Sequence, residues 1–469
     1  MSVNINELIN SLPIDDDRPE SPQLALQQLI QKLGSKKVPV GALNRLWILG
    51  TLQAKIAAAY LVHWVRSSFS GLDTKEMRLN ETHLKAAVKL LGGMSYLRGA
   101  VMKVGQILAS YPDVVPEQFA DALGRLHFEA PPMHFSMLRE LFRKELGAAP
   151  DEIFDDFETE AFAAASLGQV HRARIKGTDK RVAVKIQYPN IARTIRDDFR
   201  NMQALLFPMR LSSDWENLRE QFGEIRRMLD LEVDYEQEAR HLRAASGAFG
   251  DDEEIVIPRV YPELSTKRVL TTDYLEGVHL HDYLSTKPAQ AERDRYGRLI
   301  LLSSFRLSYS HKLLHADPHP GNYFFLNDGR LGLIDFGCCV ALTDEDIDYM
   351  AEGERAIEGS DDDVLHAVIR AGDLTPRQAR DEKRLKVLRE WAEWVWMPMV
   401  HDGPFDFGNP EYFKKGTELY GELMKKRYVR SLPVNIWLSR CFYGVRALLT
   451  RLEAQVDMRS VWKRETNVT

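Results

Sequence analysis

The stretch HADPHPGNYFFLNDGRLGLIDFG, residues 315–337, decides the fold of this chain. It opens as a polar loop, residues 315–322, with two histidines, an aspartate, two prolines, a glycine and an asparagine, and shows neither a helical nor a strand period. Two short apolar runs follow, separated by Asn327-Asp328-Gly329, which is a strong signal for a tight turn. The sequence therefore predicts a rigid loop followed by a β-hairpin that leads into Asp335.

Three oxygen-bearing side chains in this stretch have the spacing of a phosphotransfer site. Asp317 and Asn322 keep the Asp-x-x-x-x-Asn interval of a kinase catalytic loop, and Asp335 opens an Asp-Phe-Gly triplet 18 positions after Asp317. A solvated Asx-turn loop would account for the polarity and the prolines, but not for the coincidence with Asp-Phe-Gly. We expect Asp317 to position the nucleophile, and Asn322 and Asp335 to bind Mg²⁺ through oxygen atoms.

A phosphate-binding cation is expected upstream on a central strand. VAVKIQYP, residues 182–189, supplies Lys185 among alternating valines, as the Val-Ala-x-Lys strand of a kinase does. A half-buried lysine stays charged only beside a carboxylate, because desolvation lowers its pKa. The helical text LDLEVDYEQEARHL, residues 229–242, offers such carboxylates.

Three features of protein kinases are missing. The first hairpin carries AFAAASLGQVHRA, residues 161–173, in place of Gly-x-Gly-x-x-Gly. No Ala-Pro-Glu follows Asp335, and Ala316 stands where most protein kinases have arginine before the catalytic aspartate. A protein substrate would find little platform, and regulation by phosphorylation of an activation loop is not expected.

The order of elements predicts an α+β, two-lobed, kinase-like fold with a helical front end and a mostly helical C-terminal lobe. Strands are expected at VHRARI and RVAVKIQY, joined by KGTDK, and again at EIVIPRVY and RVLTTDY. A long helical block is expected over residues 191–249, and everything beyond Thr343 is predicted to be helical. The predicted parts are a mobile leader (1–40), a helical extension (41–150), an N-lobe (151–276) and a C-lobe (277–469).

Composition excludes several classes of protein. With 469 residues, 44% of them hydrophobic, the chain can bury at least one full core. A net charge of −6 gives no general attraction to nucleic acid, so no nucleic-acid partner is expected. The three cysteines make neither a disulfide framework nor a spaced zinc pair, and the start lacks a secretory signal. No apolar run is long enough to span a bilayer, which predicts a cytoplasmic protein.

One stretch, residues 43–69, predicts an amphipathic helix. It is apolar over much of its circumference but is interrupted by Arg45, Lys55, His63 and Arg66. Such a helix either packs on its own domain or binds a membrane surface or a partner, and the sequence leaves both open.

Taken together, these motifs resemble the UbiB/ADCK (AarF-type) family of atypical protein-kinase-like ATPases, whose relatives support ubiquinone biosynthesis. The resemblance covers roughly residues 90–345, and the catalytic loop HADPHPGN matches word for word. It implies that an alanine-rich loop replaces the glycine-rich loop of protein kinases, and that Lys185 contacts ATP. In this chain the loop consists of Ala163, Ala164, Ala165 and Ser166.

The resemblance also assigns a role to KVGQ, residues 103–106, the Lys-x-Gly-Gln motif of that family. By itself, a lysine with a glutamine on a helix is usually part of a solvated face. The resemblance implies instead that Lys103 and Gln106 fold over the active site, where Lys103 meets Glu232 or Asp234. It further implies that Glu238 pairs with Lys185. A front end docked in this way occupies the place where a protein substrate would approach.

The remaining expectations concern nucleotide and packing residues. TTDYLEG, residues 271–277, is predicted to be the hinge, with the backbone of Asp273, Tyr274 and Leu275 binding adenine. His315 and His319 are expected to be structural, because Mg²⁺ prefers oxygen ligands. The tryptophans of the C-terminal region are expected to pack in a core; they are Trp391, Trp394 and Trp396.

Two stretches, ILASYPDVVP (107–116) and FEAPP (128–132), depart from the usual sequence of the family, so the docking surface of the front end is expected to differ. The function expected is a Mg-ATP-dependent kinase or ATPase in ubiquinone or related prenyl-lipid metabolism, which hydrolyses ATP or phosphorylates a small molecule. We also expect peripheral membrane contact through residues 43–69 and contact with quinone-biosynthesis proteins. The alternatives are a protein kinase with a specific partner and a nucleotide-binding pseudokinase scaffold.

Overall fold

The computed structural model describes residues 134–466 except 166, 194, 197–214, 251, 253, 427 and 429–432. Almost all of these belong to one compact unit, built from residues 131–192 and 216–469, whereas residues 1–130 and 193–215 form a second unit. The predicted leader, the amphipathic stretch 43–69, the KVGQ motif with Lys103 and Gln106, and Ser166 all lie outside the described residues.

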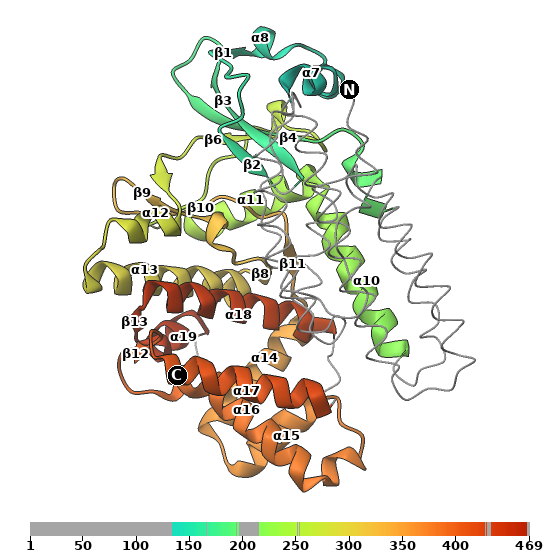
Figure 1. Cartoon of the computed structure of the whole chain (residues 1–469), viewed down its shortest axis with the longest axis vertical. Helices are drawn as coiled ribbons and strands as arrows, with labels where there is room; N and C mark the ends of the chain where they lie inside the picture. Colours follow the sequence, from blue (N-terminus) through green and yellow to red (C-terminus); the bar gives the residue numbers. More distant parts are fainter. Residues whose placement is uncertain are drawn as a thin grey trace, which may run out of the picture. The chain divides into compact units, whose positions relative to one another are not determined.

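The first sheet is antiparallel and has the strand order β1-β3-β4-β6, with β2 paired to β3 (Figure 1). Val182, Val184 and Ile186 of β4 are fully buried on one face, so Lys185 points to the other, as strand alternation requires. The predicted hairpin is confirmed as β3 and β4. The strands are β1 (Phe154–Asp155), β2 (Ala163–Ala165), β3 (Gly168–Ile175), β4 (Arg181–Gln187) and β6 (Val269–Asp273).

Two long helices follow β4 in sequence, α10 (Trp215–Glu232) and α11 (Tyr235–Phe249). The described part of the predicted block 191–249 is therefore not one continuous helix. Asp234 begins α11 as its N-cap, because its carboxylate accepts a hydrogen bond from the Gln237 N–H. α11 lies against β6 (Figure 1), which brings its first turn beneath the sheet.

The helices α7 (Phe135–Leu146) and α8 (Pro150–Ile153) belong to the same compact unit as the sheet, although the sequence placed residues up to 150 in the extension. Phe142 of α7 packs on Phe154 with ring centroids 6.2 Å apart. Glu145 accepts a hydrogen bond from the Thr266 hydroxyl at 2.8 Å. Apolar contact and a polar anchor together attach α7 to the strands.

The second sheet has the order β5-β10-β9-β7 and contains the predicted hairpin. β9 and β10 pair with Phe325 opposite Leu331, and the turn between them places Gly329 at a φ of 86°. A left-handed residue at this point is what the Asn-Asp-Gly turn requires. The strands are β5 (Ile255–Val256), β7 (Gly277–Val278), β9 (Tyr323–Leu326) and β10 (Leu331–Leu333).

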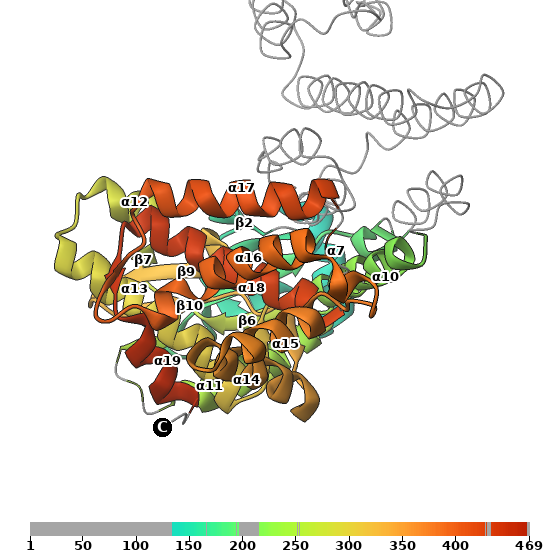
Figure 2. The same cartoon turned by 90° about the horizontal axis from the view of Figure 1, so that it is seen from below.

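The C-terminal part is mostly helical. α13 lies against α18 and α19, and α16 lies against α17 (Figures 1 and 2). The helices are α12 (Leu280–Ser285), α13 (Gln290–Phe305), α14 (Asp344–Glu358), α15 (Asp361–Ala371), α16 (Glu382–Val400), α17 (Pro410–Lys426), α18 (Pro433–Leu452) and α19 (Met458–Thr466). A π-helical turn, Arg306–Ser310, continues α13, and short 3₁₀ turns occur at Pro262–Leu264, Pro320–Asn322 and Gln378–Arg380.

Two small strand pairs interrupt this helical part. β8 (Leu313–His315) pairs antiparallel with β11 (Cys339–Ala341), on either side of the catalytic loop and the Asp-Phe-Gly triplet. β12 (Phe405–Asp406) pairs with β13 (Gln455–Val456). The prediction that everything beyond Thr343 is helical is wrong at this second pair, where strands of two residues carry no alternation that a sequence could reveal.

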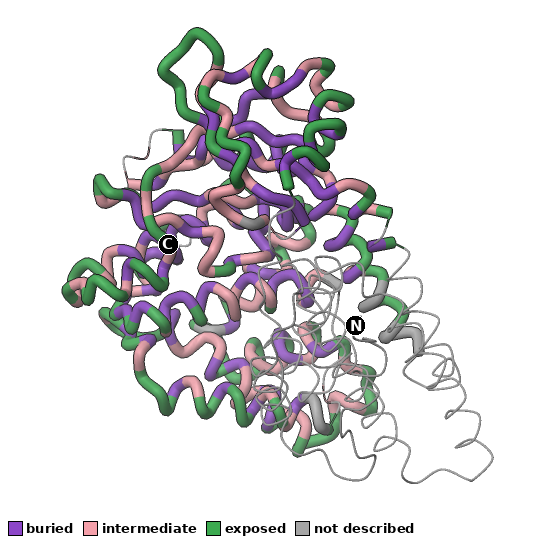
Figure 3. Tube along the Cα trace, turned by 45° about the horizontal axis from the view of Figure 1, so that its top comes forward, coloured by how far each residue is buried: buried purple, intermediate pink, exposed green. Residues whose placement is uncertain are grey.

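The buried segments run along the strands and the inner sides of the helices (Figure 3). Trp394 is 3% exposed, while Trp391 and Trp396 pack against a buried cluster formed by Val368, Leu388 and their neighbours. Core packing of the three tryptophans is therefore confirmed. Trp391 and Trp394 stack on each other with ring centroids 5.2 Å apart, whereas Trp396 lies on another side of α16, near Gly353 of α14.

Candidate active site

Lys185 lies at the centre of a buried charge cluster. Its Nζ donates to both carboxylate oxygens of Glu238 at 2.9 Å and to Oδ2 of Asp335 at 3.1 Å. These three side chains come from β4, from α11 and from the segment after β10. The structure thus brings together the lysine, the glutamate and the aspartate that the sequence proposed for one site.

The elements around Lys185 hold it in place. Pairing with Leu270 of β6 fixes its position in the sheet. The first turn of α11 places Glu238 beneath it, and the ring centroid of Tyr235 lies 5.0 Å from Nζ. The Lys185 side chain is 16% exposed and that of Glu238 is 1% exposed, so little water screens the pair.

The protonation of this cluster follows from burial and from the neighbouring charges. Burial alone would lower the pKa of Lys185, but Asp335 and then Glu238 outweigh it and hold that pKa well above its usual value. Burial raises the pKa of Glu238 to about 7, and Lys185 offsets only part of this effect. The difference arises because Lys185 faces two carboxylates, while Glu238 also faces the negative charges of Asp335 and Glu232.

A residue that the sequence did not indicate holds the catalytic loop. Arg440 of α18 donates from Nη2 to Asp317 Oδ1 and from Nε to the Ala316 carbonyl, both at 2.7 Å. Asn322 donates from Nδ2 to the Asp317 carbonyl at 2.7 Å, which closes the loop on itself. Both bonds from Arg440 require a planar, forked cation, which only arginine provides.

α18 also approaches the loop at Gly444, four residues after Arg440. A Cβ atom at Gly444 would lie 2.4 Å from Cγ of Pro318, so only glycine fits there without a shift. Arg440 and Gly444 lie on the same face of the helix. This face of α18 thus supports residues 316–318 through one polar and one steric contact.

Both histidines of the loop bind backbone atoms, in keeping with the structural role expected for them. His315 Nε2 donates to the Asp335 carbonyl at 2.7 Å, and its ring packs edge-on against Phe336. His319 Nδ1 accepts from the Gly321 N–H at 3.1 Å. In the described part of the chain, no cluster of three or more histidine, cysteine or acidic side chains is arranged to hold a metal ion.

The residues present fit a magnesium ion bound together with phosphate. A Cβ at Gly337 would lie within 3.9 Å of carboxylate oxygens of Asp335, Glu238 and Glu232, so three acidic groups converge there. Asn322 keeps Oδ1 as a possible ligand, because its bond to Asp317 uses Nδ2. Mg²⁺ commonly takes only one or two protein oxygens and completes its shell with phosphate and water.

The predicted nucleotide loop is strand β2, in which Ala163 pairs with Val170 and Ala165 with Gly168. Gly168 permits a close approach, because a Cβ there would lie 2.3 Å from the Ile186 carbonyl oxygen. Just before the loop, Phe162 packs edge-on against Tyr274 of the hinge at 5.7 Å, and Arg172 lies over the Phe162 ring at 4.4 Å. Loop and hinge are therefore joined by an aromatic bridge.

At the hinge, the N–H groups of Asp273 and Tyr274 and the Asp273 carboxylate already make hydrogen bonds within the protein. The N–H groups of Asp273 and Tyr274 donate to the carbonyls of Arg259 and Arg181, and the Asp273 carboxylate accepts from the Tyr261 hydroxyl at 2.7 Å. Among the described residues no hydrogen bond uses the Leu275 N–H. Of the three predicted adenine-binding residues, Leu275 is thus the one with an available donor.

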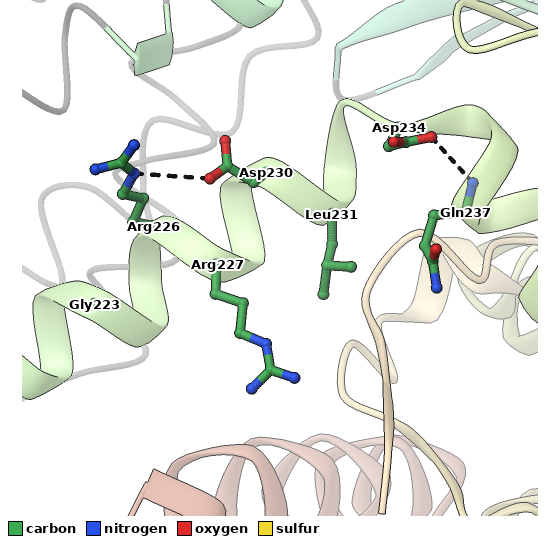
Figure 4. A pocket seen from close by; sticks show the side chains of 7 residues that line it. All are labelled: Gly223, Arg226, Arg227, Asp230, Leu231, Asp234 and Gln237. Carbon is green, nitrogen blue, oxygen red and sulfur yellow. Dashed lines mark hydrogen bonds and ion pairs between the residues drawn. The ribbon is translucent and has the colours of Figure 1, made fainter.

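Glu232 and Asp234 flank the site from the break between α10 and α11. Glu232 is 7% exposed, and Asp234 pairs with Lys267 at 3.3 Å besides capping α11. The contact of Lys103 with either acid remains a prediction, because Lys103 lies outside the described residues. An open cavity of about 320 Å³ runs along this break, and Arg227, Leu231 and Gln237 point into the same space (Figure 4).

The chain after Asp335 is short and paired. β11 begins at Cys339, and Thr343 already caps α14 through a reciprocal bond with Asp346. There is no room between β11 and α14 for an extended activation segment. This agrees with the missing Ala-Pro-Glu motif.

The family model of the ABC1 atypical kinase-like domain matches residues 125–366, just over half of the chain. The chain belongs to this family. Its curated relatives include AarF domain-containing kinases and the ACTIVITY OF BC1 COMPLEX KINASE proteins of the UbiB family. The match covers Lys185, Glu238 and the whole stretch that decides the fold.

Named relatives and one solved structure agree with this membership. ACTIVITY OF BC1 COMPLEX KINASE 1, chloroplastic, from Arabidopsis thaliana is 29% identical over 92% of this chain and 60% of its own length. AarF domain-containing protein kinase 1 from Xenopus laevis is 30% identical over 66% of this chain and 60% of its own. The complex of Rv3197 with erythromycin from Mycobacterium tuberculosis has a TM-score of 0.55 and 27% identity, and covers 83% of this chain and 98% of that one.

The chain spans between about a third and three fifths of the length of the first curated relatives that it matches. In the part of this ABC1 chain that the structure describes, no helix combines the length and apolar character that a membrane crossing needs. The family match and the Rv3197 structure show the kinase-like fold.

Sequence reasoning missed two residues that hold the site, Arg440 and His241. His241 donates from Nδ1 to the Phe336 carbonyl at 3.0 Å. No motif marks Arg440, which lies 123 positions from Asp317 in an ordinary helix. His241 had one signal, because it lies three residues after Glu238 and therefore on the same face of α11.

Proposed function

We propose that this chain binds Mg-ATP and uses it either for hydrolysis or for phosphorylation of a small molecule, in support of ubiquinone or related prenyl-lipid metabolism. The observation that carries the proposal is Lys185 held between Glu238 and Asp335. A buried ammonium with two carboxylate partners keeps its charge and would be placed to bind phosphate oxygens.

The other residues then have distinct tasks. Asp317 orients the hydroxyl or water that attacks, and Arg440 keeps its carboxylate in that direction. Asn322 and Asp335 would hold Mg²⁺, which when bound neutralises the negative charge of the phosphates. The strand Ala163–Ala165 would lie against the phosphates through its backbone, and the backbone near Leu275 would bind adenine.

The direct test compares Lys185→Met and Asp335→Asn with the wild type in Mg-ATP binding and in phosphate release. Asp402→Asn is the matched control, because this aspartate is 93% exposed and pairs only with Arg459 among the described residues. Both site variants should lose about a hundredfold or more in turnover, and the control should not. An Asp335→Asn protein that binds and hydrolyses Mg-ATP like the wild type would refute the assignment.

The first alternative is a protein kinase with a specific partner. The short link between β11 and α14 argues against it, because a peptide substrate has no activation segment to lie on. Radiolabel that appears on one particular protein and depends on Asp317 would establish this alternative in place of the small-molecule reaction.

The second alternative is a nucleotide-binding pseudokinase that organises quinone-biosynthesis proteins. The presence of Lys185, Asp317, Asn322 and Asp335 together argues against it, because a degenerate site is expected to have lost at least one of them. A protein that binds Mg-ATP, shows no turnover with any prenylated precursor, and still complements a deletion strain would favour the scaffold.

The pathway rests on kinship with the UbiB family and needs its own experiment. Metabolite profiles of a strain that lacks this protein should show a lost quinone or an accumulated prenylated precursor. Re-expression of the wild type should restore the profile, whereas Asp335→Asn should not. A deletion strain with normal prenyl-lipids would remove the pathway and leave the nucleotide chemistry standing.

A cytoplasmic location with peripheral membrane contact through residues 43–69 completes the proposal. The support is the amphipathic sequence alone, since these residues lie outside the described part. The full chain should co-sediment with anionic liposomes, and deletion of residues 1–70 should abolish this. Unchanged binding after the deletion would rule out this contact.

A further inference from the structure

We propose that His241 is a positioning residue for the metal-binding aspartate: it fixes the backbone that carries Asp335 by holding the next carbonyl, that of Phe336. The proposal deepens the function given above and rests on it for the role of Asp335. His241 is buried, at 7% exposure, and lies on α11 three residues after Glu238.

The geometry fixes the direction of the first bond. His241 Nδ1 lies 3.0 Å from the Phe336 carbonyl oxygen. A carbonyl oxygen only accepts, so the proton of the imidazole is on Nδ1. In a neutral ring Nε2 is then the acceptor.

The neighbours of His241 enforce this tautomer. Gln237 presents Nε2 to His241 Nε2 at 2.8 Å, and its Oε1 accepts from Arg240 Nε at 3.1 Å. Because a guanidinium only donates, Arg240 fixes which end of the Gln237 amide faces the ring. A directed chain therefore runs from Arg240 through Gln237 and His241 to Phe336.

A second imidazole holds the adjacent carbonyl. His315 Nε2 lies 2.7 Å from the Asp335 carbonyl oxygen, and the Gly337 N–H donates to Asp335 Oδ1 at 3.0 Å. Two successive carbonyls, of Asp335 and Phe336, are thus bound from two separate elements. The Asp335 carboxylate has little freedom to turn while both bonds exist.

α11 therefore reaches Asp335 by two routes. Glu238 acts through Lys185, which touches the carboxylate, and His241 acts through the backbone. One helix turn couples the position of the phosphate-binding lysine to that of the metal-binding aspartate. Outer contacts of this kind commonly change metal affinity by about tenfold or more.

The chain contains a matched control. His171 is also buried, presents Nδ1 to the carbonyl of Glu158 at 2.8 Å, and presents Nε2 to the Gln169 amide at 3.0 Å. It sits on β3 against Phe135 and Phe157, on the face of the sheet opposite Lys185. Its bonding pattern is the same as that of His241, but its carbonyl does not belong to the metal segment.

The experiment compares His241→Leu, His241→Asn and His171→Leu in the full chain. Asparagine places a donor nitrogen where Nδ1 stands, while leucine keeps the bulk without a donor. Amide hydrogen exchange over residues 335–342 in nucleotide-free protein should rise in His241→Leu, return towards wild type in His241→Asn, and stay unchanged in His171→Leu. Half-maximal turnover should need about tenfold more Mg²⁺ in His241→Leu only.

The outcomes separate the two proposals. Unchanged exchange over residues 335–342 in His241→Leu, or exchange that rises equally in His171→Leu, would overturn the positioning role. If exchange rises in His241→Leu while the wild-type protein itself shows no Mg-ATP turnover, the positioning role is upheld and the proposed function is refuted. Equal Mg²⁺ requirements in all four proteins would show that the bond to Phe336 does not act on Asp335.

Discussion

Arg440 orients Asp317 by a direct ion pair, with Nη2 2.7 Å from Oδ1, while its Nε binds the carbonyl of the preceding residue. The Arg440 side chain is 11% exposed, so its position is set by protein contacts rather than by water. Helix α18 thus sets the direction of the Asp317 carboxylate, which we propose faces the nucleophile.

Replacement of Arg440 by lysine should lower kcat by about ten- to a hundredfold and change KM for ATP little. Lysine cannot make both bonds at once, so Asp317 loses its orientation but not its charge partner. Steady-state turnover measures the effect. Arg451→Lys, an exposed change on the same helix, is the control, and equal kcat in the two variants would contradict the role of Arg440.

Gly444→Ala should destabilise the fold by about 1–3 kcal/mol, because the new methyl group overlaps Pro318 in a packed contact. Gly421→Ala in α17 should instead stabilise it by about 0.5–1 kcal/mol, since nothing lies within 4 Å of its Cβ position. Denaturant unfolding of both variants gives the two free energies. A neutral Gly444→Ala would mean that the loop and α18 are not in close contact.

Lys185→Met should cost about 3–5 kcal/mol of folding free energy, because it leaves the buried Glu238 and the half-buried Asp335 without their cation. A second change, Glu238→Gln, should recover part of this loss. The double-mutant cycle should give strong coupling, whereas the exposed pair Lys426 and Glu422 should couple by about 0.5 kcal/mol or less. Additive losses at Lys185 and Glu238 would contradict the buried pair.

The activity should depend on pH through Glu238, whose pKa burial raises to about 7. Above this pH the carboxylate is ionised and holds Lys185; below it, protonation weakens that hold, so turnover should fall as pH drops through about 7. The stability of the fold responds in the opposite sense. The raised pKa of Glu238 favours the folded state at low pH, and this contribution is lost as pH rises through about 7.

Turnover and stability are measured against pH in the wild type and in Glu238→Gln. The acid limb of the turnover profile should be absent from the variant. The stability of wild type relative to the variant should decline from pH 5 to pH 8. A wild-type acid limb that Glu238→Gln retains would assign it to another group.

The sequence predicted well those features that local patterns determine. The turn at Gly329 and the alternation around Lys185 each depend on a few neighbouring residues, and each appears as expected. The pairing of Lys185 with Glu238 followed from family resemblance combined with the need of a buried ammonium for a carboxylate.

Features that depend on distant parts of the chain escaped prediction. The contact of Arg440 with Asp317 joins positions 123 apart, and the bond from His241 to Phe336 joins positions 95 apart. Arg440 is of a type common on helix surfaces, so nothing local marks it, and the only local signal for His241 is its place three residues after Glu238. β12 and β13 were missed for the opposite reason, because two residues are too few to show a period.

The pairing of β8 with β11 has a consequence for inhibitors. The Ala316 N–H donates to the Cys338 carbonyl at 2.9 Å, and the Leu342 N–H donates to the Lys312 carbonyl at 2.7 Å, so backbone bonds close both ends of the pair. Phe336 is fully buried beside them. A compound that requires Phe336 to swing outward must first break this pair, and drug-like ligands for this chain should therefore be sought among those that fit the closed arrangement.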